Sequence, residues 1–144
     1  MKHILIASLL AVASPAFGQG MPAPEGAEVY FIGLEDGATV SSPLTVRFGL
    51  SGMGVAPAGT DAEHTGHHHL LVDRAPLGEG PDGEEELLYP LPADDNHRHF
   101  GAGQTEVTLD LQPGEHTLQL VLGDMNHVPH TPPVTSDRIT VTVE

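Results

Sequence analysis

Short segments that alternate apolar and polar residues constrain this chain more than any other feature of its sequence. The clearest is 44–50, LTVRFGL, in which every second residue is apolar. This alternation puts apolar side chains on one face of a strand and polar ones on the other, so one face is buried. No segment shows the sustained 3.6-residue periodicity of an amphipathic helix. The sequence therefore predicts an all-β fold.

The spacing of these segments predicts how the strands are arranged. Pro90 confines one short segment to a sheet edge, and Pro113-Gly114 makes the tight turn of a hairpin. Strands are expected near residues 28–33, 44–50, 67–73, 87–91, 105–111, 117–122 and 137–144. Short strands at this spacing are typical of an immunoglobulin-like β-sandwich. We expect one such domain, of about seven short antiparallel strands, without internal repeats.

The first residues have the pattern of a secretory signal peptide. A basic start precedes an apolar run at 4–12, and small residues follow up to Gly18. The run is shorter than the ~20 residues of a membrane span, so we expect a protein that does not span the membrane and is periplasmic or secreted after cleavage. Residues 1–18 are thus assigned to the leader, the Gly- and Pro-rich residues 19–27 to a flexible lead-in, and 28–144 to the domain.

Composition limits the chemistry that the chain can carry. It contains no cysteine, so disulfides, thiolate ligands and a lipoprotein anchor are excluded. Any metal ion must be bound by His, Met, Asp or Glu. The 20 acidic residues against 5 Lys and Arg give a formal net charge of −15, which repels nucleic acid and attracts cations. Most of this charge is expected to serve solubility or salt adaptation.

Histidines gather in three stretches of the chain: 64–69 (HTGHHH), 97–99 (HRH) and 127–130 (HVPH). All histidines of the expected mature chain except His116 belong to these stretches. In the predicted sandwich the three fall in or beside connections that lie at the same end. The strand order therefore predicts that the histidines form one cluster. Such a cluster could bind a metal ion, or it could instead form structural hydrogen bonds among the loops.

The spacing of the histidines indicates which of them are the best candidates to bind a metal ion. Side chains two residues apart share one side of an extended chain, and Pro129 stiffens the third stretch. The predicted metal ligands are His67, His69, His97, His99, His127 and His130. His64 and His68 are less favoured, because His68 should point away from its neighbours. Met53 and Met125 could add thioethers, whereas Asp124 and Asp73 could orient ligand rings.

Imidazole suits several metals, and copper(II) stands highest in the divalent affinity order, so copper is expected first and zinc second. The function predicted is metal carriage, buffering or tolerance. The alternative is a non-catalytic interaction module of the cell envelope, docking another periplasmic protein or a glycan, with structural histidines. No serine-hydrolase elbow, zinc-protease helix motif or phosphate-binding loop is present, so no enzyme is expected. A metallohydrolase built from the same histidines is the weaker catalytic alternative.

Several motifs of the chain resemble a bacterial exported family known as domain of unknown function 4399. They are VYFIGL at 29–34, GMGVAPAG at 52–59, HTGHHHLL at 64–71, HFG at 99–101, GQTE at 103–106 and NHVPH at 126–130. An acidic insertion at 78–86 departs from the pattern. The resemblance implies a single periplasmic domain and no particular activity, so the functional prediction rests on the histidines.

Overall fold

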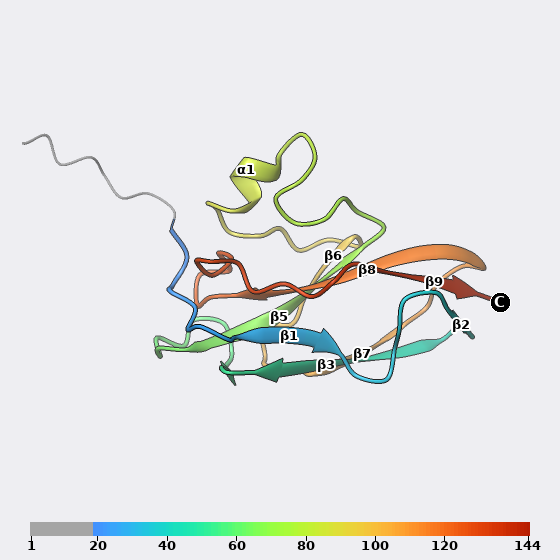
Figure 1. The fold of residues 1–144 in the computed structure, drawn as a ribbon, viewed down its shortest axis with the longest axis horizontal. Coiled ribbons are helices and arrows are strands. Elements are labelled where there is room, and N and C mark those ends of the chain that lie inside the picture. Colours follow the sequence, from blue (N-terminus) through green and yellow to red (C-terminus); the bar gives the residue numbers. More distant parts are fainter. Residues whose placement is uncertain (1–18) are drawn as a thin grey trace, which may run out of the picture.

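The computed structural model describes residues 19–144, and the expected leader at 1–18 lies outside the described residues (Figure 1). Within this range no helix is long and apolar enough to cross a membrane. The elements are β1 (Glu28–Phe31), β2 (Ala38–Val40), β3 (Leu44–Ser51), β4 (Gly54–Val55), β5 (Thr65–Val72), α1 (Gly83–Glu86), β6 (His97–His99), β7 (Glu106–Leu109), β8 (Gly114–Gly123) and β9 (Ile139–Val143).

The strands form two sheets that pack face to face (Figure 1). The smaller has the order β1-β3-β7, and the larger has the order β2-β9-β8-β5-β4 with β6 also paired to β5. One apolar cluster fills the space between them, and its buried members include Val46, Phe48, Leu70, Leu120 and Val141. The prediction of an all-β fold is therefore confirmed.

The predicted alternation is visible in β3. Val46 and Phe48 are buried in the core, whereas Thr45 and Arg47 between them are exposed. The apolar side chains of this strand face β5 and β8, and the polar ones face solvent. Burial of one face is what fixes the strand's register, because a slip by one residue would expose Val46 and bury Arg47.

The finer prediction, about seven antiparallel strands, is wrong for the described residues. They contain nine strands, and β2 pairs with β9 and β4 with β5 in parallel. The strand expected at 87–91 does not form either. Pro90 has no N–H to donate, and the N–H of Leu91 bonds to the carbonyl of His127 at 2.8 Å. The strand between β5 and β7 is instead β6.

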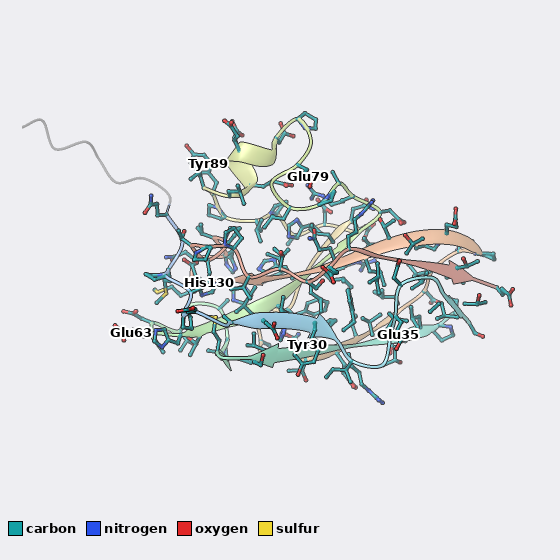
Figure 2. All side chains as sticks on the ribbon, in the orientation of Figure 1. Tyr30, Glu35, Glu63, Glu79, Tyr89 and His130 are labelled. Carbon is teal, nitrogen blue, oxygen red and sulfur yellow. The ribbon has the colours of Figure 1, made fainter. Side chains whose placement is uncertain are left out.

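The outer face of the larger sheet, turned away from the smaller sheet, is also partly covered. Leu71 of β5 and Val121 of β8 point to this side and form a second apolar cluster with Leu91. The chain between β5 and β6, which includes α1, lies over this face (Figure 1). Figure 2 shows Glu79 and Tyr89 on the same covering segment. The part of the outer face beneath this segment is therefore shielded from solvent.

Replacing Leu120 by Ala tests the core. Leu120 is fully buried between the two sheets, so truncation should lower the free energy of unfolding by about 2–5 kcal/mol. Urea unfolding followed by circular dichroism measures the change. Leu88→Ala, at a side chain that is largely exposed, is the control and should stay within about 0.5 kcal/mol of the parent. Equal losses in the two variants would contradict this core.

Candidate metal centre

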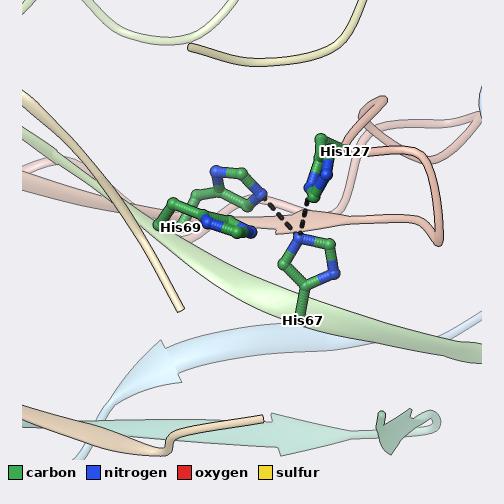
Figure 3. Close-up of side chains that lie close together, drawn as sticks. His67, His69 and His127 are labelled. Carbon is green, nitrogen blue, oxygen red and sulfur yellow. Dashed lines mark hydrogen bonds between the residues drawn. The ribbon is translucent and has the colours of Figure 1, made fainter. Parts of the chain in front are cut away.

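Four histidine rings meet on the outer face of the larger sheet. His67 and His69 come from β5, His99 from β6, and His127 from the loop between β8 and β9. Each offers one ring nitrogen, and these four nitrogens all lie within 4.8 Å of one another. Figure 3 shows His67, His69 and His127 directed toward a common point. Such a group could hold a metal ion.

Strand geometry brings three of these rings together. His67 and His69 are two residues apart in β5 and therefore point to the same side of the sheet. His99 lies directly opposite His69 in the antiparallel pairing of β5 with β6, and the two ring centroids are 5.0 Å apart. The histidines expected in or beside loops thus lie, for the most part, within paired strands, which hold their side chains more firmly than loops do.

Two glycines make room for the rings. Gly123 on β8 lies opposite His67, and a Cβ placed there would lie 2.7 Å from Nε2 of His69. A Cβ on Gly101 would overlap the ring of His99. Any larger residue at either position would push a ligand ring aside, so the absence of a side chain there is part of how the site is built.

His127 reaches the group through a tight turn that Asp124 holds together. His127 has a φ of 67°, a left-handed conformation that is uncommon for residues other than glycine. The carboxylate of Asp124 accepts hydrogen bonds from the backbone N–H groups of Asn126 (2.8 Å) and Val128 (3.0 Å). The sequence suggests that Asp124 could orient a ligand ring, whereas in the structure its carboxylate bonds to the backbone that carries His127.

The close contacts among the ring nitrogens cannot all be satisfied as hydrogen bonds. Nε2 of His67 lies 3.0 Å from Nε2 of His69 and 3.1 Å from Nδ1 of His127. A neutral ring nitrogen carries one proton or one lone pair in the ring plane, so it cannot satisfy two partners at once. A tetrahedral zinc site, with bonds of about 2.0–2.1 Å, separates its nitrogens by about 3.3 Å. The nitrogens of the group, which all lie within 4.8 Å of one another, would have to adjust toward this separation to hold an ion.

Burial favours the neutral form of three of these rings, those of His67, His69 and His99. Burial, followed by repulsion from the neighbouring rings, lowers the pKa of His69 to about 2. Burial, and then repulsion from His99 and His127, lowers the pKa of His67 to about 4. Burial also lowers the pKa of His99, and Nε2 of that ring is buried without a hydrogen-bond partner. Neutral imidazoles with free lone pairs are the form that binds metals.

His97 borders the group without belonging to it. Its ring centroid lies 5.4 Å from that of His69, and its Nδ1 lies 3.1 Å from Nη1 of Arg74. Because a guanidinium only donates, Nδ1 accepts this hydrogen bond and the ring proton sits on Nε2. Arg74 also pairs with Glu86 of α1, which connects the covering segment to the edge of the site.

The structure does not bring His130 and His64 into the group. Both ring nitrogens of buried His130 face backbone carbonyls, those of Leu122 at 3.2 Å and Thr65 at 3.1 Å. His130 therefore joins its loop to β5 and β8. His64 lies in the turn before β5 with a φ of 56°. Neither belongs to the four residues whose nitrogens converge.

His68 and Met53 belong to the core side of the larger sheet. The ring of His68 lies 5.2 Å from that of Phe48, and burial lowers its pKa to about 4. Met53 packs against the cluster between the sheets. Met125 lies in the turn before His127, where its carbonyl accepts a hydrogen bond from the N–H of Gly59.

The remaining polar residue considered from sequence, Asp73, lies away from the group. Its Oδ2 is 2.8 Å from Nδ1 of His116, and this hydrogen bond raises the pKa of His116. Sequence reasoning missed Gly123, Gly101 and Arg74. The glycines that end β8 and follow β6 were visible signals, because a glycine beside a strand often marks a close approach.

An all-β domain with a four-histidine group on one sheet face is the class of protein that these observations define. The family model described as Domain of unknown function (DUF4399) matches residues 46–144. The chain belongs to this family, and all four histidines lie in the matched part. Comparisons with curated proteins and with solved structures found no match.

Stability without metal should fall as the pH is lowered from about 6.5 to about 4. The pKa values of His67, His68 and His97 are near 4 in the folded protein, against 6.5 ordinarily. Above pH 6.5 these rings are neutral in both states. Below it the unfolded chain binds protons that the folded chain binds only near pH 4, which favours unfolding. Urea unfolding in a chelator at several pH values measures this, and an unchanged free energy between pH 7 and 4.5 would contradict it.

Replacing His68 by Leu should raise stability without disturbing the four rings. Both ring nitrogens of His68 are buried without a partner, and the side chain lies in an apolar environment beside Phe48. Removing unpaired polar atoms from a core should stabilise the metal-free domain by about 1 kcal/mol at pH 7. Thermal unfolding measures the effect. A loss of similar size would show that His68 makes a polar interaction in the folded protein.

Proposed function

We propose that this protein binds one transition-metal ion through His67, His69, His99 and His127, and serves in metal carriage, buffering or tolerance. The observation that supports this most directly is the convergence of four imidazole nitrogens within 4.8 Å. The lowered pKa values of His67 and His69, the close nitrogen pairs and the glycines that accommodate the rings support the same function. No competing role accounts for all these features together.

Copper is the metal we propose first and zinc second. The ligand set consists of imidazoles alone, which suit both ions, and copper(II) binds such sets more tightly than zinc. The thioether of Met53, considered as an additional copper(I) ligand, packs on the core side of β5. The proposal for copper therefore rests on imidazole affinity and not on sulfur.

We further propose that the protein is not an enzyme. Four protein ligands complete the tetrahedral coordination of a structural or transport site, whereas catalytic sites keep one position open for water or substrate. Three-histidine coordination with a bound water would support the metallohydrolase alternative instead. The number of imidazoles bound to the metal therefore distinguishes the two.

Two broader proposals accompany this function. The basic and apolar pattern of residues 1–18 supports export to the periplasm or beyond. An immunoglobulin-like assignment is supported by the sheet order, in which β1, β3 and β7 correspond to strands A, B and E. In the same scheme β5, β8 and β9 correspond to strands C, F and G.

Metal titration of the untagged chain from Gln19 onward tests the proposal. After removal of metal with a chelator, copper(II) and zinc should each bind with a Kd at or below about 1 μM and one ion per chain. Competition with a chromophoric chelator gives both affinity and stoichiometry. Failure to bind either ion would refute the proposed function.

His69→Asn distinguishes metal binding from a structural role for the histidines. With free zinc at a hundred times Kd, the parent should gain about 2.7 kcal/mol, or roughly 10 °C in Tm. His69→Asn should lose this gain, whereas His116→Asn, whose ring pairs with Asp73 away from the site, should keep it. An equal loss of Tm with and without metal would favour the interaction module with structural histidines.

A further inference from the structure

The segment Gln19–Pro24, here called the N-terminal strap, lies against the loop that carries His127. The N–H of Ala23 donates to the carbonyl of Thr131 at 3.0 Å, and the N–H of Thr131 donates to the carbonyl of Met21 at 3.0 Å. Pro22 and Thr131 form a parallel bridge. In Figure 1 the strap runs beside the loop between β8 and β9. The strap is therefore hydrogen-bonded to Thr131, in the middle of this loop.

Gly20 allows the strap to approach closely. It is buried, and a Cβ built on it would overlap the carbonyl oxygen of Pro129. Pro129 in turn forms a bridge with Gly123 of β8, the residue that makes room for His69. The strap thus packs on the backbone that lies next to two of the four ligands.

The strap also contributes to the turn of His127 through Asp124. The N–H of Met21 donates to Oδ2 of Asp124 at 3.1 Å, while Oδ1 accepts from Asn126 and Val128 within the turn. Asp124 is only 2% exposed, and a buried carboxylate is costly unless hydrogen bonds satisfy it. Because this carboxylate holds a residue with positive φ in place, loss of the bond from Met21 should loosen the position of His127.

We propose that the N-terminal strap positions His127, so that docking of the strap and binding of metal reinforce each other. This inference rests on the proposed function of the four-histidine site. Linkage requires the effect to be reciprocal: a docked strap raises metal affinity, and a bound metal stabilises the docked strap by the same factor. The strap thus becomes part of the site's framework, although none of its residues touches the ion.

Copper(II) titration of matched glycine variants tests this coupling. Gly20→Val should displace the strap and weaken copper(II) binding about ten-fold, a typical size for such coupling. Gly26→Ala is the control, because a Cβ there meets nothing within 4 Å, although Gly26, unlike Gly20, has a positive φ. It should lose some stability and keep its copper affinity. Equal affinities of Gly20→Val and the parent would overturn the proposal.

A second background shows whether the effect acts through His127. Asn tolerates the left-handed conformation, so His127→Asn should keep the turn while removing the ligand. In this background Gly20→Val should cause no further loss of affinity, and an undiminished ten-fold loss would overturn the proposal. If the parent binds neither copper(II) nor zinc, the proposed function fails, whereas metal binding that Gly20→Val does not weaken rejects only this inference.

Hydrogen exchange gives a readout independent of affinity. The amide of Met21 bonds to Asp124, and the amide of Ala23 bonds to Thr131. Zinc should slow hydrogen exchange at both amides, by about the same factor as the docked strap raises metal affinity. The same experiment on His127→Asn should show no such protection. Unchanged exchange of these amides in the zinc-loaded parent would contradict the coupling.

Discussion

The alternation of side chains along β5 is the constraint on which both the core and the histidine group depend. His68, Leu70 and Val72 face the smaller sheet, where Leu70 and Val72 join the main apolar cluster. His67 and His69 face the opposite side, where the covering segment and the loop after β8 meet. A slip of one residue in the pairing of β5 with β8 would turn His67 and His69 into the core and Leu70 and Val72 out of it. The apolar core therefore fixes which histidines can serve the site.

The arrangement concentrates features that are unfavourable in a folded protein. His67 and His69 each have a buried Nδ1 without a hydrogen-bond partner, two other ring nitrogens lie within 3.1 Å of Nε2 of His67, and His127 occupies a left-handed conformation. Each of these features lowers the stability of the folded protein. Together they are what is expected where a site has been built at the expense of stability. The carboxylate of Asp124 maintains the site by hydrogen-bonding to the turn and to the N-terminal strap.

Much of this could be predicted from local pattern. Alternation identified the strands at 44–50 and 117–122, and the two-residue spacing correctly put His67 with His69 on one side. Pairings between segments that lie far apart in the sequence were harder to predict. The apolar run at 87–91 resembled a strand, but Leu91 packs against Leu71 and Val121 of the sheet and Pro90 prevents regular pairing. Placing the histidine stretches together did not identify the converging four, because Arg74 engages His97 and two backbone carbonyls engage His130.

A crystal structure of the metal-loaded protein, with anomalous diffraction measured on both sides of the metal's absorption edge, tests the central claim most directly. We expect one anomalous peak on the outer face of the larger sheet, within about 2.0–2.2 Å of ring nitrogens from His67, His69, His99 and His127. A peak elsewhere on the molecule, or an empty group in crystals grown with excess copper or zinc, would contradict it.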